Sequence, residues 1–99
     1  MKGINKYINF NDLEGVKAYV SRNPLEVNQK DSNGLYPLHK ACLWGMYEIV
    51  EFFISLPFID LNVLDEKGRG VYDYSKIGGN IKIEKIIKET ISSHIRCNI

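Results

Sequence analysis

Residues 31–45 read DSNGLYPLHKACLWG, a stretch that combines a turn with the start of a helix. Asp31 and Gly34 favour a turn, because aspartate hydrogen-bonds the local backbone and glycine adopts positive φ without a steric penalty. Pro37 suits the first position of a helix, where its missing N–H costs nothing. The apolar residues that follow at helical spacing are Leu38, Ala41 and Cys42. Gly45 then predicts the end of that short helix.

The turn recurs further along the chain with the same pattern. Residues 27–34 (VNQKDSNG) and 61–68 (LNVLDEKG) both read apolar, Asn, two variable residues, Asp, two variable residues, Gly. Asp31 and Asp65 lie 34 positions apart. A fixed period of this size predicts a repeat protein, in which neighbouring units stack and share one core. An irregular domain of six helices is the alternative, but it does not account for two matched turns.

Apolar stripes predict a second helix in each unit. The central stripe consists of Ile49, Val50, Phe53 and Ile54, and the last one of Ile83, Ile86, Ile87 and Ile91. Upstream, the stripes consist of Ile4, Tyr7 and Ile8, and then of Leu13, Val16, Tyr19 and Val20. Asp12 is the predicted N-cap of the second upstream helix. Residues 71–77 predict a weaker first helix for the third unit, before the turn at Gly78 and Gly79. We therefore expect three helix pairs joined by two turns.

The stretch from Tyr36 to Cys42 resembles the ankyrin signature Thr-Pro-Leu-His-x-Ala. The matching residues, with the helix-ending glycine, are Pro37, Leu38, His39, Ala41 and Gly45. The resemblance is strong over residues 31–64, moderate over 11–30 and weak over 65–99. It implies an all-α, ankyrin-type helical solenoid of about three stacked helix pairs joined by β-hairpin-like turns. It also implies that the His39 imidazole links neighbouring turns through backbone hydrogen bonds.

The resemblance implies one ankyrin-repeat domain over residues 1–99. Its expected parts are an N-terminal cap repeat (1–30), a full repeat (31–64) and a C-terminal cap repeat (65–99). Two departures from the family pattern matter. Tyr36 stands where the family has Thr, which predicts a less rigid turn before Pro37. Residues 70–73 (GVYD) replace the signature in the last repeat. This departure predicts a frayed first helix there, with Asp73 as a candidate cap.

Composition and charge exclude several classes of protein. The 99-residue chain has a formal net charge of +1, which argues against a dedicated nucleic-acid surface. No apolar run approaches the roughly 20 residues that span a bilayer. No secretory signal opens the chain, so we expect an intracellular, cytoplasmic protein. Cys42 and Cys97 are too few for a disulfide framework and predict free thiols in a reducing compartment.

Two chemical alternatives compete with a binding role. His39 with Cys42 and His94 with Cys97 form two His-x-x-Cys pairs, which supply the ligand types of a tetrahedral zinc site. Cys42 and His39 also pair as a nucleophile and a base. The repeat signature already accounts for His39, and a buried thiol is inert. The glycine-rich segments 68–70 and 78–79 lack a phosphate-binding Lys-Ser/Thr motif. The sequence therefore predicts no catalytic residue, no metal site and no cofactor.

The resemblance implies binding through the turn tips and the exposed side of each first helix. The positions that this assigns to a partner protein are Ser32, Asn33, Leu35, Leu43, Trp44, Leu64, Glu66, Lys67 and Arg69, with Lys30, Ile77 and Gly78 at the margins. Other apolar residues already supply the core of the central repeat, so the apolar residues of this set are expected on the exposed face. An exposed apolar patch marks an interaction site. Tryptophan is enriched among binding hot spots, so Trp44 is the expected anchor. The alternative is that Trp44 folds back to fill a gap between first helices.

The expected function is that of a protein–protein interaction module acting as an adaptor, scaffold or inhibitor. A second interpretation is a regulatory or targeting domain of a larger enzyme or carrier protein. A third is a structural homodimer through the face around Trp44, although we expect a monomer. The partner is expected to be another protein, not nucleic acid or a membrane. Its identity depends on variable surface residues, because a shared fold does not imply a shared function.

Overall fold

The computed structural model describes residues 3–97, with side chains from residue 3 to residue 93. Its helices are α1 (Ile4–Asn9), α2 (Leu13–Arg22), the 3-10 helix η1 (Pro24–Asn28), α3 (Pro37–Leu43), α4 (Tyr47–Ser55), α5 (Val71–Ile77) and α6 (Ile81–Cys97). Within this described range there is no strand. None of these helices is both long enough and apolar enough to cross a bilayer.

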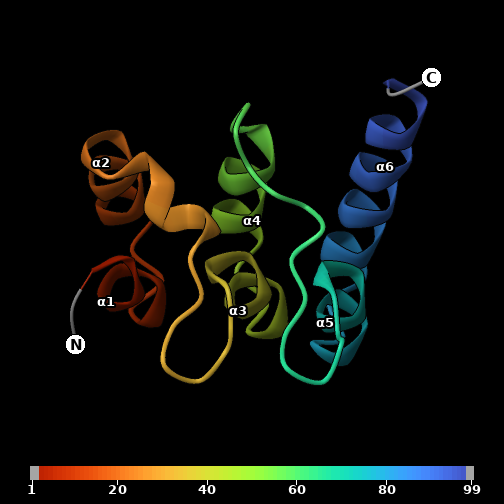
Figure 1. The fold of residues 1–99 in the computed structure, drawn as a ribbon, viewed down its shortest axis with the longest axis horizontal. Coiled ribbons are helices and arrows are strands. Elements are labelled where there is room, and N and C mark those ends of the chain that lie inside the picture. The colour runs from red at the N-terminus through yellow and green to blue at the C-terminus, as the bar shows by residue number, and fades with distance from the viewer. Residues whose placement is uncertain (1–2, 98–99) are drawn as a thin grey trace.

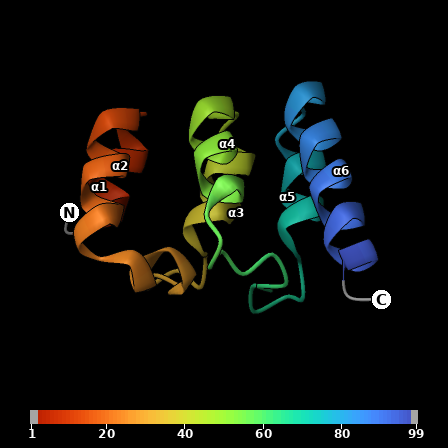
Figure 2. The same cartoon turned by 90° about the horizontal axis from the view of Figure 1, so that it is seen from above.

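The helices form two parallel rows. Figure 1 shows α1, α3 and α5 in the lower row and α2, α4 and α6 in the upper row, with two long loops below the lower row. Figure 2 shows the same three helix pairs side by side, with the loops projecting from one end. The stack measures 37 × 25 × 25 Å. The predicted all-α solenoid of three stacked helix pairs is confirmed.

The first helices of the second and third pairs match in length and position. Helices α3 and α5 are both seven residues long and begin at Pro37 and Val71, which are 34 positions apart. After each of them the chain turns through a glycine with positive φ, 71° at Gly45 and 73° at Gly79. A glycine reaches this left-handed conformation without strain, which lets the second helix of each pair fold back against the first.

Side-chain hydrogen bonds cap the starts of several helices, α2 and α5 among them. The Oδ1 atom of Asp12 accepts the N–H of Gly15 at 3.0 Å, which confirms Asp12 as the N-cap of α2. At the start of α5, the carboxylate of Asp73 accepts the N–H of Gly70 at 2.9 Å. The expectation of a frayed first helix in the third repeat was wrong, because α5 forms in full from Val71. Asp73 supplies a local hydrogen bond where the ankyrin signature is missing.

One continuous core runs through the stack. Its fully buried side chains include Ile8, Val16, Leu38, Ala41, Ile49, Val50, Phe53, Val71, Ile83 and Ile87. No single pair covers its own apolar face, so each pair is stabilised by its neighbours. The outer side of α5 differs from that of α3. Asp73 and Lys76 are exposed there, at the positions where α3 carries the buried His39 and Cys42.

Candidate partner-binding surface

The two loops between the helix pairs share one hydrogen-bond pattern. In both, the aspartate Oδ1 accepts the N–H groups of the residues two and four positions later, at 2.8 and 3.1 Å for Asp31 and at 2.9 and 2.8 Å for Asp65. The N–H of each aspartate donates to the carbonyl four positions later, at 2.9 and 3.0 Å. Gly34 and Gly68 have φ of 81° and 79°. The loops are therefore two copies of the same hairpin-like turn.

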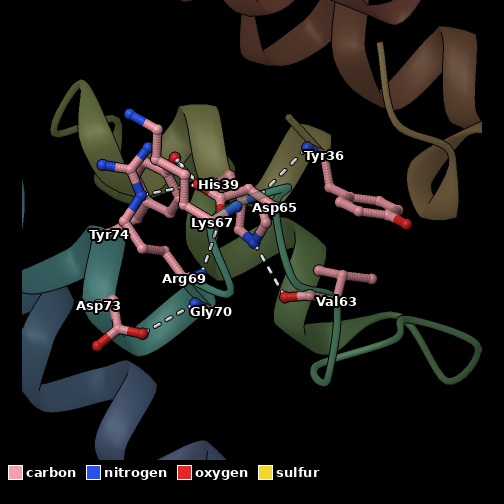
Figure 3. Close-up of polar contacts among 9 residues, drawn as sticks. All are labelled: Tyr36, His39, Val63, Asp65, Lys67, Arg69, Gly70, Asp73 and Tyr74. Carbon is pink, nitrogen blue, oxygen red and sulfur yellow. Dashed lines mark hydrogen bonds and ion pairs between the residues drawn. The ribbon is translucent and has the colours of Figure 1, made fainter. Parts of the chain in front are cut away.

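The second carboxylate oxygen ties each turn to the helix that follows. Asp31 forms an ion pair with the ammonium group of Lys40, and both side chains are almost fully covered. The Oδ2 atom of Asp65 instead accepts the hydroxyl of Tyr74 at 2.5 Å and the Nε–H of Arg69 at 2.8 Å (Figure 3). Lys40 and Tyr74 are 34 positions apart and are therefore equivalent residues of successive repeats. An ammonium group in one repeat and a phenol hydroxyl in the next bind the carboxylate of the turn aspartate.

These contacts keep both carboxyl groups ionised. Burial raises the pKa of Asp31, but the hydrogen bonds from Lys40 and from two backbone N–H groups outweigh burial and leave the pKa below its usual value. The hydrogen bond from Tyr74 is the largest influence on Asp65. Together with the donors of Arg69, it holds the pKa of that carboxyl well below its usual range. The turn tips therefore keep their shape at neutral pH.

His39 connects the two turns. Its Nδ1 accepts the backbone N–H of Tyr36 at 3.4 Å, so Nε2 carries the proton and donates to the carbonyl of Val63 at 3.0 Å (Figure 3). The imidazole lies 4.7 Å from the ring of Tyr74, measured between centroids. This confirms that His39 links neighbouring turns through backbone hydrogen bonds. The bond to Tyr36 also holds the backbone before Pro37, where the family's threonine hydroxyl is missing.

A hollow of about 360 Å³ lies between the turn tips and the ends of α3 and α5. Its lining residues are Asn33, Leu35, Leu43, Asp65, Glu66, Lys67, Arg69, Tyr74 and Ile77. The floor is apolar and the wall formed by the second turn is charged. Pockets that combine an apolar surface with a few fixed polar groups are typical binding sites.

Comparison with known proteins supports the assignment of the fold. The family described as "Ankyrin repeats (many copies)" matches residues 6–54. The chain belongs to the ankyrin-repeat family. Repeat proteins of this kind bind partners through extended concave surfaces, so this ankyrin chain is a protein-interaction module. No curated protein matches the chain.

One similar solved structure is the complex of the predatory endopeptidase Bd0816 from Bdellovibrio bacteriovorus with the immunity protein Bd3460. A chain in that complex has a TM-score of 0.79 and 23% identity over 91% of the ankyrin chain. This likeness shows a shared fold. The ankyrin chain spans only 46% of the length of that chain.

The hollow brings together six of the nine residues predicted to bind a partner: Asn33, Leu35, Leu43, Glu66, Lys67 and Arg69. The other three do not line it. Ser32 is exposed on the first turn, Leu64 is 58% exposed, and Trp44 is 49% exposed at the end of α3. The ammonium of Lys40 lies 6.0 Å from the Trp44 ring centroid. Trp44 therefore does not fill the core, and its role as an anchor stays a prediction.

Two residues of the hollow were not predicted from the sequence. From the sequence, Asp65 is recognisable only as a turn residue. The one sequence feature that points to Tyr74 is that it lies 34 positions after Lys40, at the equivalent place in the next repeat. Gly78 was placed at the margin of the contact surface. A Cβ at Gly78 would lie 2.5 Å from the carbonyl oxygen of Cys42, so this position faces α3 rather than a partner.

The structure also shows the surroundings of His39 and Cys42, the residues of the two chemical alternatives on the first helix. Both ring nitrogens of His39 are engaged by the backbone. Burial raises the pKa of the Cys42 thiol to about 12, which leaves it un-ionised and inert. Among the described residues, no group of three or more His, Cys, Asp or Glu side chains could hold a metal. The side chains of His94 and Cys97 lie outside the described residues.

The side chain of Glu66 reaches back over the first turn. A Cβ at Gly34 would lie 3.3 Å from the Glu66 side chain, whereas a Cβ at Gly68 would meet nothing within 4 Å. We expect Gly34→Ala and Gly68→Ala each to lower the free energy of unfolding by about 1 kcal/mol, because both glycines have positive φ. Gly34→Ala alone should also displace Glu66. Urea denaturation measures the shared effect.

NMR measures the expected difference between the two glycine variants, which is the displacement of the Glu66 side chain. Side-chain chemical shifts of Glu66 should change in Gly34→Ala and stay unchanged in Gly68→Ala. Equal shifts in both proteins would mean that the two turn tips do not touch through Glu66.

The buried His39 predicts a pH-dependent stability. Burial is the main reason that the pKa of His39 lies below its usual value. Between that lowered pKa and about 6.5, the unfolded chain binds a proton that the folded chain does not. The free energy of unfolding should therefore fall below about pH 6.5, by up to about 1.4 kcal/mol per pH unit. Urea denaturation at several pH values measures this slope.

The control for the pH experiment isolates one imidazole. His94 is replaced by Gln in all samples, which leaves His39 as the titrating histidine. The slope should disappear when His39→Gln is added. Identical slopes with and without His39 would assign the pH dependence to other groups.

Proposed function

We propose that this ankyrin domain binds another protein through the hollow between its turn tips, in a binding rather than a catalytic role. The observation that carries the proposal is the combination of an open apolar floor with charged residues that are already held in place. Leu35 and Leu43 are half-buried in the floor, and Ile77 is 54% exposed. Covering such a surface with a partner removes apolar area from water.

The second turn supplies the polar side of the proposed interface. The Nε of Arg69 is fixed by Asp65, and its guanidinium carbon lies 5.2 Å from the ring centroid of Tyr74. A restrained guanidinium loses less conformational entropy when it meets a carboxylate. Lys67 and Glu66 are exposed beside it and form the rim. We therefore propose that the partner inserts an apolar side chain and places an acidic group near Arg69.

Affinity capture with matched surface variants tests the proposal. Ile77→Lys puts a charge on the apolar floor, and Trp44→Ala removes the candidate anchor. Ile81→Lys is the control, because Ile81 is 80% exposed at the start of α6 and does not line the hollow. Truncating a hot spot costs about 2 kcal/mol or more, which is roughly a thirtyfold loss of affinity. Partner recovery should fall by this order for Ile77→Lys and Trp44→Ala.

Melting temperature and light scattering show whether a change in partner recovery comes from unfolding or from self-association. The melting temperatures of the three variants should stay close to that of the wild type, because Trp44, Ile77 and Ile81 are 49%, 54% and 80% exposed. Equal recovery of the partner by Ile77→Lys and Ile81→Lys would contradict the proposed interface. Light scattering that shows a dimer lost in Trp44→Ala would favour the homodimer instead.

A regulatory or targeting domain within a larger protein is the second candidate. The observation that favours it is that the similar chain in the endopeptidase–immunity protein complex is about twice as long, since the overlap covers 91% of this chain but only 46% of that one. An immunoblot of the native cell extract tests this. A band at the mass of the 99-residue chain would contradict the second candidate.

A further inference from the structure

Three hollows between α2 and α4 join into one groove. Their volumes are about 290, 350 and 320 Å³. The first and second hollows share Leu13 and Glu48 in their walls, and the second and third share Lys17 and Phe52. The groove therefore follows the length of the two helices. Figure 1 shows α2 and α4 in the upper row, on the far side of α3 from the turn tips.

One end of the groove is apolar. Its walls there include Val20, Pro24, Leu56 and Phe58. Phe58 is 40% exposed, and Leu25, next to Pro24 on η1, is 71% exposed. Large apolar side chains that remain accessible around a groove indicate an interaction site, because water contact with them is unfavourable.

The middle of the groove and its other end are acidic. Glu48 and Glu51 are exposed on α4, and neither forms an ion pair with any side chain that the structure describes. The one cation in the wall is Lys17. Its ammonium lies 3.8 Å from the carboxylate of Glu14 and 6.0 Å from the ring centroid of Phe52. Because Glu14 offsets Lys17, the groove carries a net negative charge.

We propose that the groove between α2 and α4 binds a peptide segment of a partner protein that carries basic residues at one end and bulky apolar ones at the other. The basic side chains meet Glu48 and Glu51, and the apolar side chains pack beside Phe52 and Phe58. Opposite charges position such a segment along the groove and give specificity, while apolar burial provides affinity. This second surface does not involve the hollow at the turn tips, so either surface can fail without the other.

Peptide display on the intact chain tests the groove. A library of random 12-residue peptides is selected on the wild-type protein, and enriched peptides are titrated by fluorescence anisotropy. Two groove variants are compared: Glu48→Lys with Glu51→Lys, and Ser55→Arg, which adds bulk and positive charge to the wall. The control is Glu84→Lys with Glu89→Lys, an equal charge change on α6, where neither residue lines the groove or the hollow at the turn tips. Circular dichroism melting checks that each variant is folded.

The expected result is an enriched family that combines Lys or Arg with Leu, Phe or Trp. Its affinity should fall at least tenfold in both groove variants and remain unchanged in the control. The proposal is overturned if no enriched family loses affinity in the groove variants. It is also overturned if the wild type self-associates and the groove variants do not, because the occupant is then a second copy of this chain.

Discussion

Replacing His39 with alanine is expected to lower the free energy of unfolding by about 3 kcal/mol. The substitution removes the acceptor of the Tyr36 N–H and the donor to the Val63 carbonyl, in a place where His39 has no exposed surface. Each buried group without a partner costs about 1–3 kcal/mol. For a domain of this size the melting temperature should fall by roughly 12 °C or more. Urea and thermal denaturation measure both quantities.

The matched control lies one repeat further along the chain. Asp73 occupies the position of His39 in α5, is exposed, and accepts a single backbone hydrogen bond, from Gly70. Asp73→Ala should cost only about 1 kcal/mol, as for the loss of a helix cap. Equal losses for the two variants would show that His39 acts as a local cap and does not hold two repeats together.

Gly78→Ala is expected to have the second large effect on stability. Helix propensity alone predicts that this substitution stabilises the protein, whereas we expect it to destabilise the protein. Gly78 has φ of −67°, a helical conformation in which alanine is favoured over glycine by up to about 1 kcal/mol. The new Cβ would lie 2.5 Å from the carbonyl oxygen of Cys42 and 2.8 Å from that of Leu43. Backbone atoms cannot rotate away, so α3 and α5 must separate. We expect a loss of about 3 kcal/mol, the upper range for overpacking.

Gly79→Ala separates the steric effect from backbone strain. Gly79 has positive φ, but a Cβ there meets nothing within 4 Å. Its loss should be limited to about 1 kcal/mol of strain. Denaturation midpoints of the two variants can be compared directly. A Gly78→Ala protein as stable as the wild type would mean that α3 and α5 slide apart at little cost.

The spacing of α3 and α5 also controls the proposed interface. Leu43 and Ile77, at the ends of these two helices, line the floor of the hollow. A shift of α5 away from α3 would widen that floor. Gly78 therefore contributes to the binding surface as a close-packing residue, although it is not itself available to a partner.

Local sequence signals were sufficient for most of the architecture. The two Asp/Gly turns, the helix start at Pro37 and the bounds of α5 agree with the structure. These features depend on residues within a few positions of one another, where backbone sterics and local hydrogen bonds dominate. The departure from the ankyrin signature at residues 70–73 was misleading, because Asp73 provides a different local hydrogen bond at the start of the helix.

Contacts between turns and helices were decided by the tertiary structure. The repeat period indicates that Lys40 and Tyr74 are equivalent, but only the packed stack brings the first to Asp31 and the second to Asp65. The same holds for the close approach of Gly78 to α3. The amino-acid sequence by itself determined the repeating unit, through short-range turn and helix signals. The stacking of those units determined the hollow, because its floor and wall come from residues far apart in the chain.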